Sequence, residues 1–255
     1  MASSPTEIEI HRFTSFDGVE LAWSEMGEGR PVVLIHGFFS SAWTNWIRYG
    51  HAAKVAARGF RVIMPDLRAH GHSAAPHDPA AYPRDVLARD TMALLAHLNL
   101  ADYDLGGYSL GARTVVRMLT TGAAPRRVIL SGMGLEGLTN TGARSGHFRH
   151  ILTNLGKHER GSPEWLAEAF LKTTGGDAEA LIHVVDSFVD TTPDQLKAIE
   201  QPVLVLSGAE DDDNGSHRAL AELLPHAELR EVPGTHMGAV IRPELGQAIA
   251  DFLAA

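Results

Sequence analysis

A serine between two glycines, Gly107-Tyr-Ser109-Leu-Gly111, is the stretch of this sequence best suited to chemistry. A short apolar segment precedes it, and the residues from Leu110 to Leu119 place their apolar side chains at helical spacing. A chain that passes from strand to helix within so few residues strains its apex residue and needs small neighbours. We therefore expect the Ser109 hydroxyl to stand at a helix N-terminus, where free N–H groups favour negative charge.

A serine hydroxyl is a weak nucleophile until a base takes its proton, and that base needs an acid to orient it. The loop after the last predicted strand carries His236, the candidate base, and the loop after another strand carries four adjacent carboxylates. Among these we favour Asp211 by its spacing from the preceding glycine, with Asp212 and Asp213 as alternatives. The spacing of the run does not match a Ca²⁺-binding loop.

The elements that must position these residues alternate between strand and helix. Continuous apolar runs are typical of strands covered on both faces, and they occur at Pro31–Ile35, Arg61–Met64, Arg127–Leu130 and Pro202–Leu206, with a last strand at Ala227–Val232. Helical patterns follow, ending at about Arg58 and spanning Arg84–Leu98, Leu110–Leu119, Ser216–Leu224 and Arg242–Ala255. The alternation predicts an α/β fold with a mostly parallel, doubly wound sheet. Two shorter runs, Glu7–Ser15 and Val19–Glu25, flank a turn and predict a β-hairpin before it.

The alternation breaks between Leu135 and Glu200, where three helical patterns occur without a strand. Ser162 before Pro163 is typical of a helix start, and Thr192 with Gln195 has the spacing of a capping box. Because the block lies between two sheet strands, we predict a helical cap over one end of the sheet. The expected division is a core of residues 1–134 and 201–255 and a cap of residues 135–200.

These motifs, in this order, resemble the α/β-hydrolase fold superfamily, and within it the capped members similar to serine carboxylesterases. His36-Gly-Phe38 after an early strand resembles the family's oxyanion loop. Asp66-Leu-Arg-Ala-His-Gly-His-Ser73 is similar to its Asp-x-Arg-Gly-His-Gly-x-Ser loop, with Ala69 in place of the usual glycine. The resemblance covers essentially the whole chain and puts Ser109, Asp211 and His236 at the nucleophile, acid and base positions.

The resemblance implies acyl transfer to Ser109, with the oxyanion held by the backbone N–H groups of Leu110 and Phe38. The expected substrate is a small or medium, largely apolar carboxylic ester. A serine at this position argues against the haloalkane dehalogenase and epoxide hydrolase branches, which use aspartate. A lactonase, a carbon–carbon bond hydrolase, a cofactor-free perhydrolase and a non-enzymatic ligand receptor on this fold remain alternatives.

Composition excludes several other functions. The net charge of −9 argues against nucleic acid or an anionic membrane as the main partner, and the absence of cysteine removes disulfides, thiolate metal sites and a cysteine nucleophile. The first residues lack the basic and apolar regions of a signal peptide, and no apolar run reaches membrane-spanning length. We expect a soluble, cytoplasmic protein.

Two histidine pairs, His70 with His72 and His147 with His150, have spacings at which two side chains could share a metal ion. Neither pair has a carboxylate at a familiar ligand spacing, so we expect loop and surface histidines and predict no metal and no cofactor. We expect His36 to be a structural hydrogen-bonding residue beneath the oxyanion loop.

Overall fold

The computed structural model of the chain describes residues 8–255. Glu7, the start of the predicted hairpin, and the N-terminal residues that bear on a signal peptide lie outside the described residues. The hairpin itself is present, because β1 (His11–Thr14) and β2 (Glu20–Met26) pair antiparallel. None of the helices in the described part of the chain is long and apolar enough to cross a membrane.

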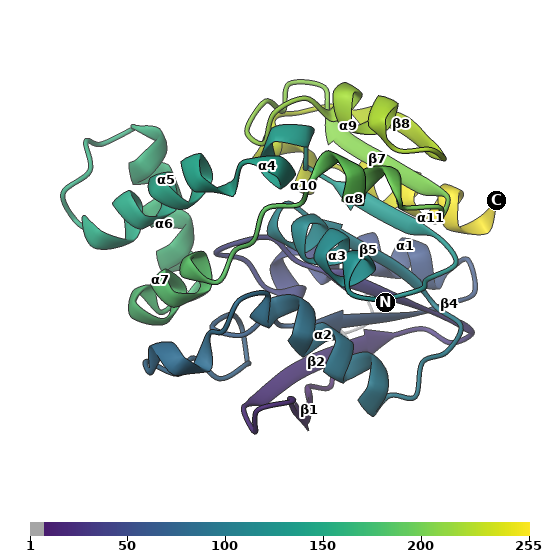
Figure 1. Ribbon diagram of the computed structural model, residues 1–255, viewed down its shortest axis with the longest axis horizontal. Coiled ribbons are helices and arrows are strands. Elements are labelled where there is room, and N and C mark those ends of the chain that lie inside the picture. Colours follow the sequence, from purple (N-terminus) through teal and green to yellow (C-terminus); the bar gives the residue numbers. More distant parts are fainter. Residues whose placement is uncertain (1–7) are drawn as a thin grey trace, which may run out of the picture.

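The strands form one eight-stranded sheet in the order β1-β2-β4-β3-β5-β6-β7-β8 (Figure 1). The remaining strands are β3 (Arg30–Ile35), β4 (Phe60–Pro65), β5 (Asp104–Tyr108), β6 (Val128–Ser131), β7 (Val203–Gly208) and β8 (Ala227–Val232). Pairing is antiparallel between β2 and β4 and parallel from β4 to β8. Because parallel strands end at the same edge, the loops after β3, β5, β7 and β8 all leave from one edge of the sheet.

Two apolar cores lie on the two faces of the sheet. Val32 and Leu34 of β3 pack into one buried cluster, and Val33 and Ile35 pack into the other, as the alternation of a strand requires. Helices on the Val33 face are α2 (Val86–His97), α3 (Leu110–Thr120) and α9 (His217–Leu223), and those on the Val32 face are α1 (His51–Ala56) and α11 (Pro243–Ala254). Helices therefore cover both faces, which confirms the predicted doubly wound, mostly parallel sheet.

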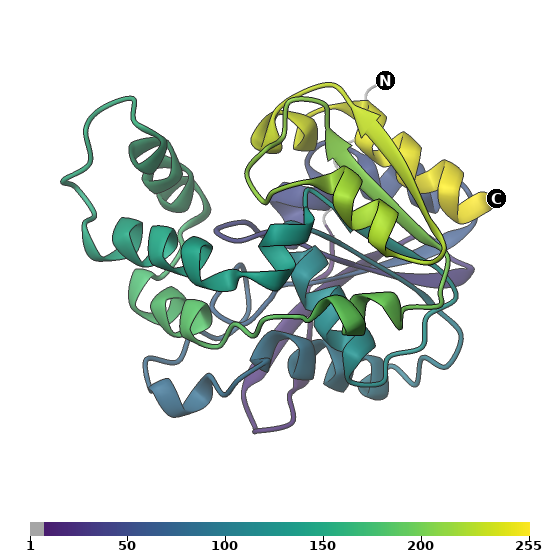
Figure 2. The same cartoon turned by 45° about the horizontal axis from the view of Figure 1, so that its top comes forward.

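The segment between β6 and β7 is helical throughout. It comprises α4 (Leu135–Thr139), α5 (Thr141–Thr153), α6 (Pro163–Thr174), α7 (Ala178–Asp186) and α8 (Pro193–Lys197). In both views α5, α6 and α7 lie together beyond one end of the sheet (Figures 1 and 2), whereas α4 and α8 contact α9. Ser162 and Thr192 cap α6 and α8, and Thr192 forms a capping box with Gln195. That residues 135–200 form a cap distinct from the core remains a prediction.

The structure differs from the predicted elements at several places. The helical stretch before Arg58 is broken at Gly50, whose φ of +76° separates a π-helical turn, Trp43–Ile47, from α1. Helix α2 begins at Val86 instead of Arg84, because Asp85 is left-handed with φ +58°. A short helix that the sequence analysis did not predict, α10 (His236–Val240), begins at the candidate base itself.

Candidate active site

The strand-to-helix turn at Ser109 has the strained geometry that the glycine spacing predicts. Ser109 has φ +54° and ψ −112°, a conformation that side-chain-bearing residues rarely adopt. A Cβ on Gly111 would lie 2.1 Å from the carbonyl oxygen of Ile35, and one on Gly107 would lie 2.2 Å from the carbonyl carbon of Gly111. Both positions therefore require glycine, and the turn holds the serine side chain above the end of β5.

A continuous hydrogen-bond chain joins the three predicted residues. The Nε2 atom of His236 lies 3.1 Å from the Ser109 hydroxyl oxygen, and its Nδ1 atom lies 2.9 Å from a carboxylate oxygen of Asp211. The three come from the ends of β5, β7 and β8. His236 and Asp211 are each only 8% exposed, so little water competes for these contacts. This arrangement polarises the serine hydroxyl toward the imidazole.

The structure distinguishes Asp211 from the other carboxylates of its loop. Asp212 and Asp213 are exposed, and Asp213 pairs with Arg144 instead of with His236. Burial raises the pKa of Asp211, but its hydrogen bond to His236 and the charges of His236 and His217 outweigh burial and leave the pKa below the usual range. Asp211 therefore stays ionised at neutral pH.

Backbone contacts hold the acid loop against the histidine loop. The Glu210 N–H donates to the Gly234 carbonyl, and the Thr235 side chain caps α10 by accepting from the Gly238 N–H. The hydroxyl of Tyr108, next to the serine, donates to the carbonyl of His236. The role of Tyr108 as a positioning residue was not predicted, since nothing in the spacing of the motif links it to a residue so far along the chain.

The predicted oxyanion donors border the same space as the serine. Phe38 and Ser109 line one cavity, and Leu110, the first residue of α3, lines a smaller one together with both of them. The backbone N–H groups of Phe38 and Leu110 make no hydrogen bond to any acceptor in residues 8–255, so they remain available to a ligand oxygen. The preceding N–H, that of Gly37, donates instead to the Asn45 side chain at 2.9 Å.

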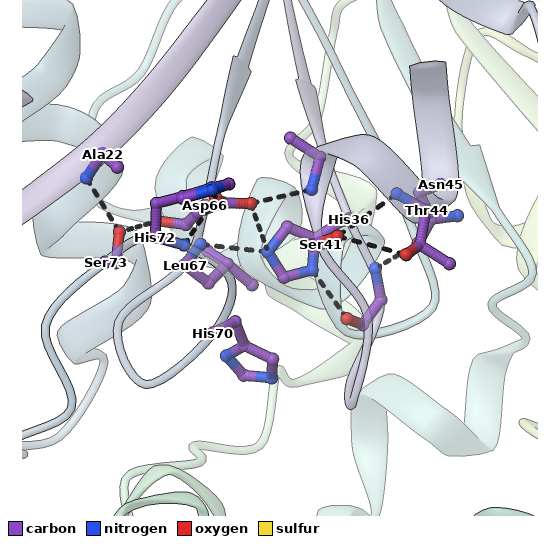
Figure 3. Close-up of polar contacts among 12 residues, drawn as sticks. Ala22, His36, Ser41, Thr44, Asn45, Asp66, Leu67, His70, His72 and Ser73 are labelled. Carbon is purple, nitrogen blue, oxygen red and sulfur yellow. Dashed lines mark hydrogen bonds and ion pairs between the residues drawn. The ribbon is translucent and has the colours of Figure 1, made fainter. Parts of the chain in front are cut away.

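A polar network that includes the buried side chains of His36 and Asp66 connects the loops after β3 and β4 (Figure 3). The imidazole of His36 lies between the carbonyl of Gly37, 2.7 Å from Nδ1, and the N–H of Leu67, which donates to Nε2 at 3.0 Å. Asp66 accepts from the backbone N–H groups of Ala42 and His72. His36 thus carries out the structural role expected of it, by joining the loop after β3 to the loop after β4.

Ala69, in the loop after β4, departs from the family pattern and causes backbone strain. Ala69, which replaces the usual glycine, has φ +65°. A side-chain-bearing residue in this left-handed region is strained by roughly 1 kcal/mol relative to glycine. The Ala69 N–H donates to the Ala74 carbonyl, which holds the loop closed.

His70 lies beneath Phe38 and makes folding stability depend on pH. Burial lowers the pKa of His70 to about 3, and its Nε2 has no hydrogen-bond partner among the described residues. In the unfolded chain its pKa is about 6.5, so between these values the unfolded state binds more protons. His70 therefore makes its full contribution to the free energy of unfolding above about pH 6.5. This contribution decreases as the pH is lowered toward 3.

We expect His70→Phe to lessen this loss, because Phe keeps a buried ring that cannot be protonated. Unfolding by urea at pH 8 and at pH 5 should show a stability difference smaller by about 1–2 kcal/mol in the variant than in the wild type. An unchanged difference between the two pH values would contradict the buried, neutral state of His70.

The cavity at Ser109 is small and mainly apolar. Its volume is about 70 Å³, and Phe170 of α6 and Met237 and Ile241 beyond His236 line it together with Ser109 and Phe38. Among the aromatic residues of the predicted cap, Phe148 and Phe188 line a second cavity beside Ser109. The site therefore lies between the end of the sheet and the helical segment.

The histidine pairs considered as metal ligands have other partners. The Nδ1 atom of His70 lies 2.9 Å from the Arg68 carbonyl oxygen, and that of His72 lies 3.1 Å from Asp66. His147 and His150 lie on α5, where the ring of His150 contacts that of His158. Within residues 8–255 no group of three or more His, Cys, Asp or Glu side chains is arranged to hold a metal ion.

A mostly parallel sheet with Ser, Asp and His, in that chain order, after the ends of three of its strands is typical of an α/β hydrolase. Residues 32–247 match the model of the alpha/beta hydrolase family, so the chain belongs to that family. A non-heme chloroperoxidase of Kitasatospora aureofaciens is 31% identical over 266 residues, which cover 90% of this chain and 93% of that protein. A non-heme haloperoxidase of Rhodococcus erythropolis is 27% identical, with coverage of 88% and 92%.

The same fold occurs in a solved thermophilic esterase of Thermogutta terrifontis, with a TM-score of 0.78 and 23% identity over 96% of this chain and 98% of that one. At this identity the likeness shows the fold alone. Family membership and the full-length relatives support a hydrolase.

Proposed function

We propose that the protein is a serine hydrolase that cleaves small-molecule carboxylic esters through a Ser109-His236-Asp211 triad. The observation that carries this proposal is the hydrogen-bond chain from the Asp211 carboxylate through His236 to the Ser109 hydroxyl. Each contact has the length that a nucleophile, its base and the orienting acid need.

In the proposed reaction, His236 takes the hydroxyl proton as Ser109 forms a bond to the ester carbonyl carbon. The Asp211 carboxylate holds the imidazole with its proton on Nδ1 and stabilises the imidazolium. The N–H groups of Phe38 and Leu110 receive the oxyanion, and each such donor typically contributes about 10²–10³-fold in rate. His236 returns the proton to the departing alcohol, and water then hydrolyses the acyl-enzyme with His236 again as base.

A second candidate is the cofactor-free perhydrolase reaction at the same triad. The names of the two full-length relatives, a chloroperoxidase and a haloperoxidase, favour it. Hydrogen peroxide would replace water in attacking the acyl-enzyme and release a peracid and the free serine. Lactone and carbon–carbon bond hydrolysis use the same residues, whereas a receptor would need no triad.

A panel of p-nitrophenyl esters with acyl chains from C2 to C12 tests the proposal. We expect turnover to peak at short chains, because the cavity of about 70 Å³ has no room for a long one. A parallel assay with acetate and hydrogen peroxide measures peracid formation and separates the second candidate from the first. A folded protein that hydrolyses none of the esters would contradict ester cleavage.

A further inference from the structure

A second, smaller cavity opens beside Ser109, on the side of α3 and α5. Its volume is about 10 Å³, and Ser109, Phe38, Arg113 and Arg144 are among the residues that line it. Such a volume accommodates one group of about the size of a water molecule. Two positively charged guanidinium groups therefore lie at one small cavity beside the nucleophile, and this placement needs a chemical explanation.

Arg113 is a buried cation to which no carboxylate of residues 8–255 is bonded. It is 5% exposed, and its Nε and Nη2 atoms both donate to a single carbonyl oxygen, that of Gly137. Asp190 attracts it through space, but that carboxylate accepts a hydrogen bond from the Thr141 N–H. Burial and the nearby charge of Arg144 lower the pKa of Arg113 to about 10, so it remains protonated at neutral pH.

Arg144, at the start of α5, brings a second positive charge to the same cavity. Its Nη2 pairs with Asp213 at 3.1 Å, while its Nε is buried and has no hydrogen-bond partner among the described residues. Each arginine lies over an aromatic ring, Arg113 over Phe188 at 4.6 Å and Arg144 over Phe148 at 4.9 Å. These rings hold the guanidinium groups in place without neutralising them.

A buried charge is costly unless an opposite charge and full hydrogen bonding compensate it. Here two like charges line the same cavity, and the one carboxylate bonded to either of them among the described residues, that of Asp213, is 41% exposed. We propose that Arg113 and Arg144 form a subsite for a carboxylate group of the substrate, so that the preferred esters also carry a free carboxylate. This inference rests on the proposed ester hydrolysis at Ser109.

The placement on α3 fits a substrate group close to the reacting carbonyl. Arg113 lies in the first turn of α3, where its backbone N–H donates to the Ser109 carbonyl at 3.1 Å, and both residues line the smaller cavity. The smaller cavity admits one carboxylate oxygen, and the larger cavity, which shares Phe38 and Ser109 with it, takes the rest of the ester. Ser109 lines both cavities.

Ester pairs that differ only in charge test the subsite. Monomethyl glutarate is compared with its primary amide, and 3-acetoxypropanoate with 3-acetoxypropanamide, so that the carboxylate lies on the acyl side in one pair and the alcohol side in the other. Acid release gives kcat/KM for each. We expect the wild type to favour the carboxylate member of at least one pair by about 10–100-fold, the range for a lost charge-assisted hydrogen bond.

The variants Arg113→Met and Arg144→Met should reduce that preference to within about threefold, mainly through KM of the charged ester. Arg149 lies on α5, like Arg144, but is 45% exposed and paired with Asp186. Arg149→Met therefore removes a positive charge from the surface only and should keep the preference. Arg144→Met also serves if loss of Arg113 prevents folding, since Arg144 does not bond to the Gly137 carbonyl.

Calorimetry on Ser109→Ala with glutarate separates this inference from the proposed function, because it needs no turnover. We expect glutarate to bind, and to bind at least tenfold more weakly when Arg144→Met is added. Hydrolysis of neutral esters with no preference for either carboxylate would overturn the subsite and leave the esterase proposal in place. Failure to hydrolyse any ester, with glutarate bound at the arginines, would overturn the reaction and leave the subsite.

Discussion

Replacing Ser109 with alanine is expected to reduce kcat for p-nitrophenyl esters by about 10⁴-fold or more while leaving the protein folded. The hydroxyl is the atom that His236 contacts at 3.1 Å, and alanine offers no nucleophile in its place. Alanine has the same Cβ as serine, so the strained φ of +54° is neither relieved nor made worse. The turn depends on Gly107 and Gly111, which stay.

A buried serine at the end of the neighbouring strand supplies the control. Ser131 closes β6, is 0% exposed, and its hydroxyl has no hydrogen-bond partner among the described residues. Ser131→Ala should therefore hydrolyse the esters at close to the wild-type rate. Circular dichroism and the thermal midpoint confirm folding of both variants, and full activity in a folded Ser109→Ala protein would exclude Ser109 as the nucleophile.

The positions of the central strands were predictable because a strand that is buried on both faces has a continuous run of apolar residues. The runs Pro31–Ile35 and Pro202–Leu206 consist of apolar residues. Their bounds agree with those of two central strands, β3 and β7, to within one or two residues. The turn at Ser109 was predictable for a different reason, since the close approach of Gly111 to Ile35 admits only glycine. Both signals can be recognised within a few consecutive residues, although one reflects burial and the other backbone geometry.

No comparable sequence pattern indicates the contacts that position the site. The bond from Tyr108 in β5 to the His236 carbonyl joins segments far apart in the sequence, and that from Gly37 to Asn45 depends on the course of the chain after β3. Likewise, Arg113 and Arg144 look like ordinary helical residues until the fold brings both to the cavity beside Ser109. Residue type and spacing indicate which groups can react, whereas the tertiary structure decides which side chains surround the substrate.

Asp211→Asn is expected to lower kcat for a neutral p-nitrophenyl ester by about 10³–10⁴-fold, and Asp213→Asn by no more than about threefold. The reason lies in the proton on His236. The Asp211 carboxylate, 2.9 Å from Nδ1, accepts only, so it fixes the proton on Nδ1 and leaves Nε2 free to take the serine proton. An asparagine amide can donate to Nδ1 instead, which moves the proton to Nε2 and blocks the base.

The Asp213 side chain has no part in that choice of tautomer. Its carboxylate is paired with Arg144, and only its backbone N–H reaches Asp211, donating at 3.2 Å to the oxygen that does not face His236. Asparagine at position 213 keeps this N–H, so the orientation of Asp211 survives. Steady-state kinetics on the two variants decide the assignment, because equal losses would mean that Asp211 does not select the tautomer. A larger loss in Asp213→Asn would transfer the role of acid to Asp213.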